Sequence, residues 1–350
     1  MTNRQGTDMT DIRLPAEWED QEGVLLAWPH AVANWKLHLD RARQTIARII
    51  AQITRFQRVI LATTTPAEAA TFLRDAKAVM ERVAFYPVAT NDAWARDFGP
   101  ITVIEAGRPV LLDFTFNGWG GRFPAEADDV VPQGLKAHGA FGRIHLRTLH
   151  FVLEGGSIDS DGHGTLLTTA SCLSNPNRNP HLTRQEIDMT LRRFLGARRV
   201  LWLEHGHLAG DDTDGHVDML ARFAPHDTVL YMECDDTRDE HFDALAAMAA
   251  ELESFRTVDG KPYRLIPLPW PAPKFDAIGQ RLPLSYANFL VINGAVLVPT
   301  YEDARDSLAL DAIGAAFPGR KIVGVDSSAL VFQHGALHCV TMQLPKGTLA

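Results

Sequence analysis

Short apolar runs occur in pairs along the chain, and a turn signal separates the two members of each pair. The four pairs are residues 101–105 with 110–116, 156–159 with 165–169, 216–223 with 228–233, and 286–292 with 295–300. Asp-Gly at 161–162 and Asn-Gly at 293–294 are strong hairpin signals, because a type I′ turn needs positive φ at both central positions. Ala-Gly at 106–107 and Pro-His at 225–226 are weaker signals. The pattern predicts four β-hairpins.

A helical pattern follows each predicted hairpin, and a further extended run comes after it. The helices are expected at residues 130–138, 183–196, 242–255 and 304–317, and extended runs follow the last three at 200–203, 264–268 and 321–325. Thr183 and Glu186 form a capping box at the start of the second helix, which Gly196 can end. The first helix has the least support, because Pro132 interrupts it. Each unit therefore combines a hairpin, a helix and a third strand.

The two ends of the chain each contribute one unpaired apolar run. Residues 24–28 precede a helical stripe over residues 42–53, and residues 337–344 come after the fourth unit. The hairpins recur at intervals of roughly 60 residues, which indicates radial repetition. Pairing the first run with the last would close a ring of five units and remove exposed sheet edges. From spacing alone, an ordinary α/β sheet remains the alternative.

Composition narrows the function classes. The 350 residues are 46% hydrophobic, which is enough for a sizeable core. The net charge of −9 argues against a nucleic-acid partner, which would need a basic face. No apolar run approaches the length of a membrane span, so no membrane role is expected. The three cysteines are odd in number and widely spaced, which favours a reducing, cytoplasmic compartment over a disulfide scaffold.

No internal segment marks a domain boundary. The chain has no low-complexity block, no charge run and no Ser/Gly linker. Residues 1–13 are polar and are expected to form an N-terminal tail without a signal peptide. We therefore expect a single domain over residues 14–350.

Reactive side chains recur at one place in the units, just before or at the start of the first strand of a hairpin. Asp97 precedes the first hairpin, Glu154 precedes the second, and His216 and Asp218 open the third. Cys339 is expected within the last strand. If the units are arranged radially, these positions converge on one axis, and residues far apart in the chain meet at one site.

Cys339 is the strongest nucleophile candidate among the three cysteines. It follows a polar loop that contains a glycine and two histidines, and such surroundings can lower the pKa of a thiol. Cys172 and Cys234 are expected to be buried small hydrophobic residues, the common state of a free cysteine.

Residues 204–218 are the densest cluster of polar side chains. Histidines at 205, 207 and 216 and aspartates at 211, 212, 214 and 218 could form a metal site. No single helix or strand periodicity would place the three histidine side chains together. In a strand, His216 and Asp218 would share a face and could act together on one substrate. The residues alone leave metal and non-metal chemistry open.

Several of these stretches together resemble the agmatine deiminase family of the guanidino-group-modifying pentein superfamily. The matching stretches are residues 14–19, 28–30, 91–100, 116–121, 153–158, 175–180 and 213–223, continuing to Cys339. The resemblance implies an α/β fold of five ββαβ units, a pentein propeller with pseudo-fivefold symmetry that the N- and C-terminal strands close. It also implies that the enzyme uses no metal and no cofactor, and it suggests a homodimer.

Carried over by position, the resemblance makes Cys339 the nucleophile and His216 the general acid and base. The acidic residues that hold the guanidinium group and orient His216 match Asp97, Glu154 and Asp218. Two aromatic residues, Trp94 and Trp119, match the lining of the substrate channel. The implied reaction is attack of the thiolate on the guanidinium carbon, loss of ammonia, and hydrolysis of an S-amidino intermediate.

The expected substrate is a small cationic guanidinium compound, most specifically agmatine, which would give N-carbamoylputrescine and ammonia. The sequence near the candidate site is rich in acidic and aromatic residues, which favours a dication over a zwitterion. The family's Gly-Gly-Gly-Asn-Ile-His-Cys loop is replaced here by Gln-His-Gly-Ala-Leu-His-Cys at residues 333–339. Alternatives are a deiminase of arginine or peptidyl-arginine, a zinc amidohydrolase built on the cluster at 205–218, and a catalytically silent binding propeller. The intact set of nucleophile, histidine and carboxylates counts against the last.

Overall fold

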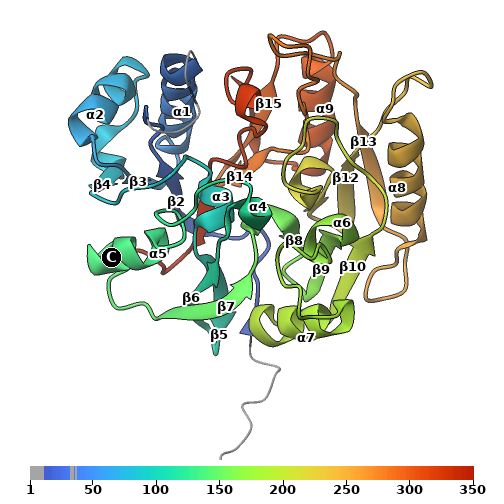
Figure 1. The fold of residues 1–350 in the computed structure, drawn as a ribbon, viewed down its shortest axis with the longest axis horizontal. Helices are drawn as coiled ribbons and strands as arrows, with labels where there is room; N and C mark the ends of the chain where they lie inside the picture. The colour runs from blue at the N-terminus through green and yellow to red at the C-terminus, as the bar shows by residue number, and fades with distance from the viewer. Residues whose placement is uncertain (1–11, 32–34, 36–37) are drawn as a thin grey trace, which may run out of the picture.

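The computed structural model describes residues 12–31, 35 and 38–350, and their strands form five separate sheets (Figure 1). The first sheet has the order β1-β5-β6-β7, with β1 at Ile12–Arg13, β5 at Ile101–Glu105, β6 at Arg108–Thr115 and β7 at Leu146–Val152. The second has the order β10-β9-β8, with β8 at Ile158–Ser160, β9 at Thr165–Thr169 and β10 at Arg199–Leu203. The fold is therefore a mixed α/β fold built on several sheets.

The remaining described strands form three further sheets. The third joins β11 (Ala221–Ala224), β12 (Thr228–Met232) and β13 (Arg264–Leu268). The fourth joins β14 (Leu290–Ile292), β15 (Ala295–Thr300) and β16 (Lys321–Asp326). The fifth has the order β17-β2-β3-β4, with β17 at Met342–Pro345, β2 at Gln21–Ala27, β3 at Arg58–Ala62 and β4 at Val83–Tyr86.

All five sheets contain an antiparallel pair and a parallel neighbour. Strands β5 and β6, β8 and β9, β11 and β12, and β14 and β15 form the four predicted hairpins, each extended by a parallel third strand. In the fifth sheet β17 pairs antiparallel with β2, so the pairing of the first and last apolar runs is confirmed. Ala106 and Gly107 have φ values of 51° and 74°, as a type I′ turn requires. The third turn lies at His226 and Asp227, one residue later than expected.

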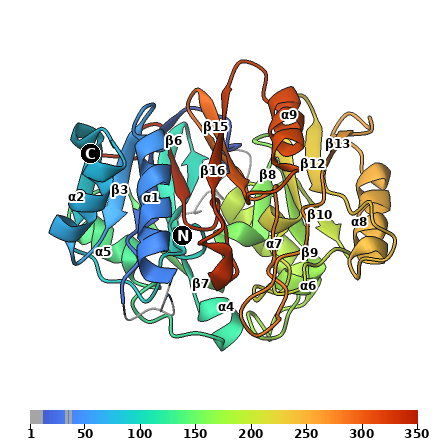
Figure 2. The same cartoon turned by 90° about the horizontal axis from the view of Figure 1, so that it is seen from above.

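The longer helices lie outside the strands (Figures 1 and 2). The helices are α1 Leu39–Ile53, α2 Pro66–Asp75, α3 Ala95–Phe98, α4 Gly118–Gly121, α5 Val131–Ala137, α6 Ala170–Leu173, α7 Arg184–Leu195, α8 Phe242–Ser254 and α9 Asp306–Ala316. The predicted capping box of α7 is formed by Thr183 and Glu186, and Gly196 ends the helix at a φ of 68°. Pro132 lies in the first turn of α5, where its missing N–H breaks no helical hydrogen bond.

Several predicted strands are shorter than expected, and the errors at residues 216–223, 286–292 and 337–344 affect residues of the site. Residues 216–223 do not form one strand, because Val217–Met219 is a 3-10 helix and only Ala221–Ala224 is extended. His216 and Asp218 therefore do not share a strand face. Residues 337–344 become extended only at Met342, so Cys339 lies in the turn before β17 and not in the strand. These buried apolar runs look extended in sequence, but their backbone forms turns, in which the Met219 N–H donates to the His216 carbonyl and the Thr341 N–H donates to the His338 carbonyl. Residues 286–292 likewise become extended only at Leu290.

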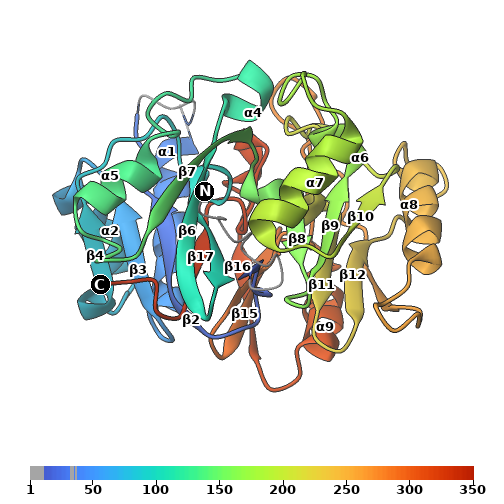
Figure 3. The same ribbon diagram turned by 90° about the horizontal axis from the view of Figure 1, so that it is seen from below.

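The two ends of the described chain lie close to the sheets. Residues 1–11 of the expected tail lie outside the described residues, whereas Ile12 and Arg13 form β1 and pair with β5. Figure 3 shows the molecule from below, with the C-terminus beside β3 and β4. Among the described residues, no helix combines the length and apolar character needed to cross a membrane.

Candidate active site

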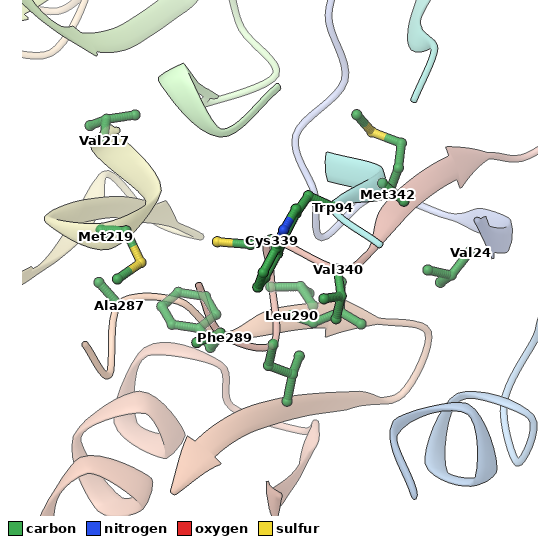
Figure 4. Close-up of a cluster of buried hydrophobic side chains, with 14 of the residues drawn as sticks. Val24, Trp94, Val217, Met219, Ala287, Phe289, Leu290, Cys339, Val340 and Met342 are labelled. Carbon is green, nitrogen blue, oxygen red and sulfur yellow. The ribbon is translucent and has the colours of Figure 1, made fainter. Parts of the chain in front are cut away.

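A cavity of about 280 Å³ is lined by five of the residues that the sequence nominated. They are Trp94, Asp97, Trp119, His216 and Cys339. Glu154 and Asp218, the other two nominated residues, are fully buried behind this wall and contact it through hydrogen bonds and charges. In Figure 4 the Cys339 side chain lies in an apolar cluster with Trp94, Met219 and Phe289. The site thus combines residues from five distant parts of the chain.

Cys339 is positioned by Asn288, which lies just before β14. Asn288 Nδ2 donates to Cys339 Sγ at 3.2 Å, and Asn288 Oδ1 accepts from the Cys339 backbone N–H at 3.3 Å. Burial and the carboxylates of Asp218 and Asp97 raise the pKa of the thiol well above its usual value, although Asn288 opposes this shift. These effects favour the thiol over the thiolate.

Asp218 has one occupied and one free carboxylate oxygen. Its Oδ2 faces His338 Nδ1 at 2.7 Å and accepts from Asn288 Nδ2 at 3.2 Å. Its Oδ1 is buried and finds no hydrogen-bond partner among the described residues. Burial raises the pKa of Asp218, but His338 and His216 outweigh burial and lower it overall. Asp218 is consequently a carboxylate with an acceptor atom available for an N–H donor.

Asp97 links His216 to the cavity wall. Asp97 Oδ1 accepts from the Gly156 N–H at 3.0 Å and lies 3.7 Å from His216 Nδ1, while Asp97 Oδ2 accepts from Trp119 Nε1 at 2.9 Å. Burial raises the pKa of Asp97 to about 6. Burial lowers the pKa of His216, but the charges of Asp97 and Glu154 and the contact with Cys172 together outweigh burial and raise that pKa well above its usual value. His216 Nε2 makes no hydrogen bond to any described residue and remains available for proton transfer.

Glu154 is held by an arginine that the sequence did not nominate. Arg178 Nε contacts both Glu154 oxygens at 3.0 and 3.1 Å, and both side chains are fully buried. Ligand atoms of Glu154, Cys172 and His216 lie within 4.8 Å of one another. Cys172 is thus buried as expected, but it also lies beside the histidine of the site. Glu154 is therefore placed to influence His216 rather than to contact a ligand in the cavity.

The three histidines of residues 204–218 are not brought together. His205 is half exposed and pairs with Glu251 at 2.6 Å, whereas His216 is buried against Asp97. The ring of His207 lies 5.6 Å from that of His241. Among the described residues, Glu154, Cys172 and His216 are the one group whose atoms are close enough for a shared metal ion, and Arg178 already occupies the carboxylate. The histidine cluster of the zinc alternative is therefore not formed.

The two tryptophans line the cavity from unusual backbone segments. Trp119 has φ 54° and ψ 52° in a left-handed turn between Gly118 and Gly120, which directs its indole N–H to Asp97. Trp94 stacks on Trp35 with ring centroids 5.6 Å apart. A Cβ on Gly335 would lie 2.2 Å from the Trp94 ring, so the altered loop keeps a glycine where the indole requires it.

Three further aspartates line the cavity wall beside apolar and neutral residues. Asp92, Asp211 and Asp212 line it, and burial raises the pKa of Asp212 to about 6. The described residues that line the cavity include no lysine or arginine. Arg122, which donates to the backbone carbonyl of the lining residue Asp212, is paired with Asp214. An acidic, partly aromatic cavity of this kind suits an elongated cation.

Asn288, His338, Glu17 and Arg178 support the site but were not nominated from the sequence. A signal for Asn288 was present, because it precedes the first strand of the fourth hairpin, as Asp97 does in the first. It was hidden by the assignment of residues 286–292 to a strand. Arg178 lies in the motif at residues 175–180, but nothing in that motif indicates which carboxylate it contacts.

Known proteins similar to this chain include several deiminases. The family profile described as Porphyromonas-type peptidyl-arginine deiminase matches residues 13–345. The agmatine deiminase of Pseudomonas aeruginosa strain LESB58 is 34% identical over 371 aligned positions, covering 99% of each chain. A protein of Shewanella sp. strain MR-4, provisionally assigned as an agmatine deiminase, is 35% identical and covers 95% of this chain and 94% of its own.

The solved structures similar to this chain also include deiminases. The agmatine deiminase of C. jejuni with substrate bound has a TM-score of 0.90 at 37% identity, covering 99% of both chains. A Porphyromonas gingivalis protein provisionally assigned as an arginine deiminase has a TM-score of 0.92 at 46% identity, covering 97% of this chain and 100% of its own. An arginine dihydrolase from cyanobacteria shares the fold alone, at 14% identity and a TM-score of 0.51.

Proposed function

Since the chain belongs to the Porphyromonas-type peptidyl-arginine deiminase family, we propose that it hydrolyses agmatine to N-carbamoylputrescine and ammonia. The observation that carries this proposal is the convergence of one thiol, one histidine and two carboxylates on a single acidic cavity. Cys339, His216 and Asp97 line the cavity, and Asp218 lies directly behind it, with its Oδ2 3.8 Å from Cys339 Sγ. They are the groups needed to bind a guanidinium cation, attack its carbon and protonate the leaving nitrogen.

Carboxylate oxygens with free lone pairs can accept hydrogen bonds from the guanidinium group. The cation is planar and presents N–H donors in a fixed fork, which carboxylates bind well. Asp218 Oδ1 has no partner among the described residues, and the Asp97 oxygens each retain a free lone pair. The Trp94 ring adds a surface for cation–π contact. These contacts place the central carbon near Cys339 Sγ, which is 3.8 Å from Asp218 Oδ2.

Attack requires the thiolate, which the bound cation favours. Its positive charge offsets the carboxylates that raise the pKa of Cys339. The thiolate then forms a C–S bond to the guanidinium carbon and gives a tetrahedral adduct. His216 protonates one nitrogen of this adduct, the C–N bond breaks, and ammonia leaves. An S-amidino group remains on Cys339.

Hydrolysis uses the same residues in reverse. His216, now without its proton, takes a proton from water, and the water oxygen bonds to the amidino carbon. The C–S bond then breaks and returns the thiolate, and the hydroxyl proton of the adduct passes to solvent, where ammonia can accept it, which leaves the neutral urea group of N-carbamoylputrescine. General acid–base assistance of this kind is typically worth about 10²–10⁴ in rate. Glu154 and Asp97 keep His216 oriented and favour its protonated form.

The choice of agmatine over arginine rests on charge. Agmatine carries an ammonium group at the end remote from the guanidinium, where Asp92, Asp211 and Asp212 line the cavity. The α-carboxylate of arginine would meet these acidic residues instead. Arginine or peptidyl-arginine remains the second candidate, because the family description and the P. gingivalis relative name arginine substrates.

The proposal extends to the architecture and the cellular setting. The five sheets would be the five ββαβ units of a pentein propeller with pseudo-fivefold symmetry, within one domain over residues 14–350. The repeated hairpin with its parallel third strand supports this arrangement. The enzyme would act in the cytoplasm without metal, cofactor, nucleic acid or membrane, and it would assemble as a homodimer. Unchanged activity after exhaustive chelation tests the metal part.

Parallel assays of related guanidines test the substrate assignment. Ammonia release and product identity would be measured with agmatine, arginine, arginine methyl ester and a peptide with internal arginine. We expect the highest kcat/KM for agmatine, and a higher value for the methyl ester than for arginine because the ester lacks the negative carboxylate. A clear preference for arginine or the peptide would overturn agmatine but retain the guanidinium chemistry. No ammonia from any of them would overturn the proposed function.

A further inference from the structure

His338 lies between two buried carboxylates, one of which belongs to the proposed guanidinium site. Its Nδ1 is 2.7 Å from Asp218 Oδ2, and its Nε2 is 2.8 Å from Glu17 Oε1. The imidazole is 1% exposed and does not line the cavity. His338 is therefore placed to act on the site through Asp218, whose Oδ1 has no hydrogen-bond partner among the described residues.

Glu17 is anchored by two guanidinium groups. Arg96 Nη1 donates to Glu17 Oε1 at 3.3 Å, Arg222 Nη2 donates to Glu17 Oε2, and Gln343 Nε2 also donates to Oε2 at 2.8 Å. Burial raises the pKa of Glu17, but Arg222, His338 and Arg96 outweigh burial and hold it well below its usual value. Glu17 is thus a fixed carboxylate behind the site.

The two short contacts of His338 need two protons. A neutral imidazole has one N–H, so its second nitrogen would present a lone pair to a carboxylate oxygen. Glu17 is ionised by its arginines, so the second proton belongs to His338 and Asp218. Burial and the guanidinium groups of Arg222 and Arg96 lower the pKa of His338, whereas His338 itself lowers the pKa of Asp218, so neither group is strongly favoured as the holder of this proton. A proton shared between Nδ1 and Asp218 Oδ2 across the 2.7 Å contact would satisfy both groups.

We propose that His338 is a positioning residue for the deimination reaction, which fixes Asp218 through a shared proton and ties it to the Glu17 anchor. The proposal rests on the proposed function, because it needs Asp218 to bind the guanidinium group. The contact fixes Oδ2 and leaves Oδ1 directed to the substrate. The charged and titratable groups that face the imidazole are Asp218, Glu17, Arg96 and Arg222, with the Cys339 thiol on the next residue.

Two substitutions separate the two contacts of His338. The side-chain nitrogen of His338→Asn can replace Nδ1 and donate to Asp218, whereas that of His338→Gln can reach Glu17 in place of Nε2. The loss of a hydrogen bond to a charged group corresponds to a decrease in kcat/KM of about 10- to 100-fold. We expect His338→Gln to lower kcat/KM for agmatine by about this factor and His338→Asn to recover a substantial part of the loss.

A matched control is available in His241, which is also buried and contacts a carboxylate, Asp239, at 2.7 Å. His241 lies outside the cavity that contains Cys339. His241→Asn should leave kcat/KM within about twofold, because the loss of a buried imidazole contact alone does not disturb the site. Equal kcat/KM values for wild type, His338→Gln and His338→Asn would overturn the positioning role. So would equal losses in His338→Gln and His241→Asn.

The shared proton is tested without substrate. In protein labelled with ¹⁵N-histidine, we expect a far-downfield N–H proton assigned to His338 Nδ1, absent from Asp218→Asn and retained in His241→Asn. Absence of this signal in the wild type would overturn the shared proton. If the wild type released no ammonia from any guanidine, the proposed function would fail, whereas this spectrum would still decide the contact between His338 and Asp218.

Discussion

The side-chain amide of Asn288 contacts Cys339 at both the sulfur and the backbone. Nδ2 lies 3.2 Å from Sγ, and Oδ1 accepts from the backbone N–H groups of His338 at 2.9 Å and Cys339 at 3.3 Å. One residue therefore fixes the nucleophile's position and provides the N–H donor that a thiolate needs. Asn288 comes from the fourth hairpin unit, so this unit also contributes to the site.

Replacement of Asn288 should impair formation of the thiolate. In Asn288→Ala the burial and the charges of Asp218 and Asp97 remain, while the opposing hydrogen bond is lost, so the pKa of Cys339 should rise further. We expect kcat to fall by about 10- to 100-fold. Iodoacetamide inactivation, followed against pH without substrate, should shift to higher pH. An unchanged inactivation profile would show that the amide does not stabilise the thiolate.

Agmatine binding should weaken as Asp97 becomes protonated. The pKa of Asp97 is about 6, so its carboxylate charge is present above that pH and is lost below it. Cys339→Ala protein permits binding to be measured without turnover, by calorimetry at several pH values. Trp119→Phe in this background removes the N–H bond that favours the ionised form. Its binding transition should move to higher pH, and an identical transition in both proteins would contradict this role of Trp119.

Asp212 should distinguish agmatine from shorter guanidines. Asp212→Asn removes a negative charge from the cavity wall, and we expect the KM for agmatine to rise about tenfold because a charge-assisted contact is lost. Methylguanidine has no ammonium group, so its kcat/KM should change little. A similar loss for both substrates would place the effect of Asp212 at the guanidinium end instead.

The stability of the loop before Trp94 should depend on pH through Asp128. Asp128 Oδ1 accepts from the Asn91 N–H at 2.7 Å and the Asp92 N–H at 3.3 Å, and burial raises the pKa of this carboxyl to about 8. Between an unfolded pKa near 4 and pH 8, the folded state binds more protons at this position, so its contribution to stability falls by up to roughly 1.4 kcal/mol per pH unit.

Asp128→Asn keeps the accepting oxygen and removes the titration. The variant should therefore gain stability relative to the wild type between pH 5 and pH 8, as measured by urea unfolding at both values. A stability difference that is the same at both pH values would contradict the raised pKa.

The sequence predicted the hairpins well because their turns depend on local residues. Ala106-Gly107, the weaker signal, adopts positive φ at both positions, whereas at Asp161-Gly162 and Asn293-Gly294 only the glycine does. The strand prediction failed at residues 216–223 and 337–344, where a buried apolar run was interpreted as a strand. There the backbone turns so that His216 and Cys339 face the interior, and that requirement comes from the site and not from local propensity.

The polar groups behind the site could not be derived from sequence spacing. Glu17 and His338 are in contact although 321 positions separate them. Arg178 reaches Glu154 from another segment, and its motif gave no hint of that partner. Such pairs depend on how the sheets pack, whereas Asp97, Glu154, His216 and Asp218 could be found because each was expected just before or at the start of a hairpin.

The central claim is that Cys339 attacks the guanidinium carbon and carries the amidino group. The most direct test is rapid acid quenching of the enzyme during turnover of agmatine, followed by peptide mass spectrometry. The account predicts an S-amidino adduct on the peptide that contains Cys339, formed before the steady state and absent from Cys339→Ala and from enzyme without agmatine. Turnover of agmatine by Cys339→Ala at a rate near that of the wild type, or an adduct on Cys172 instead, would contradict it.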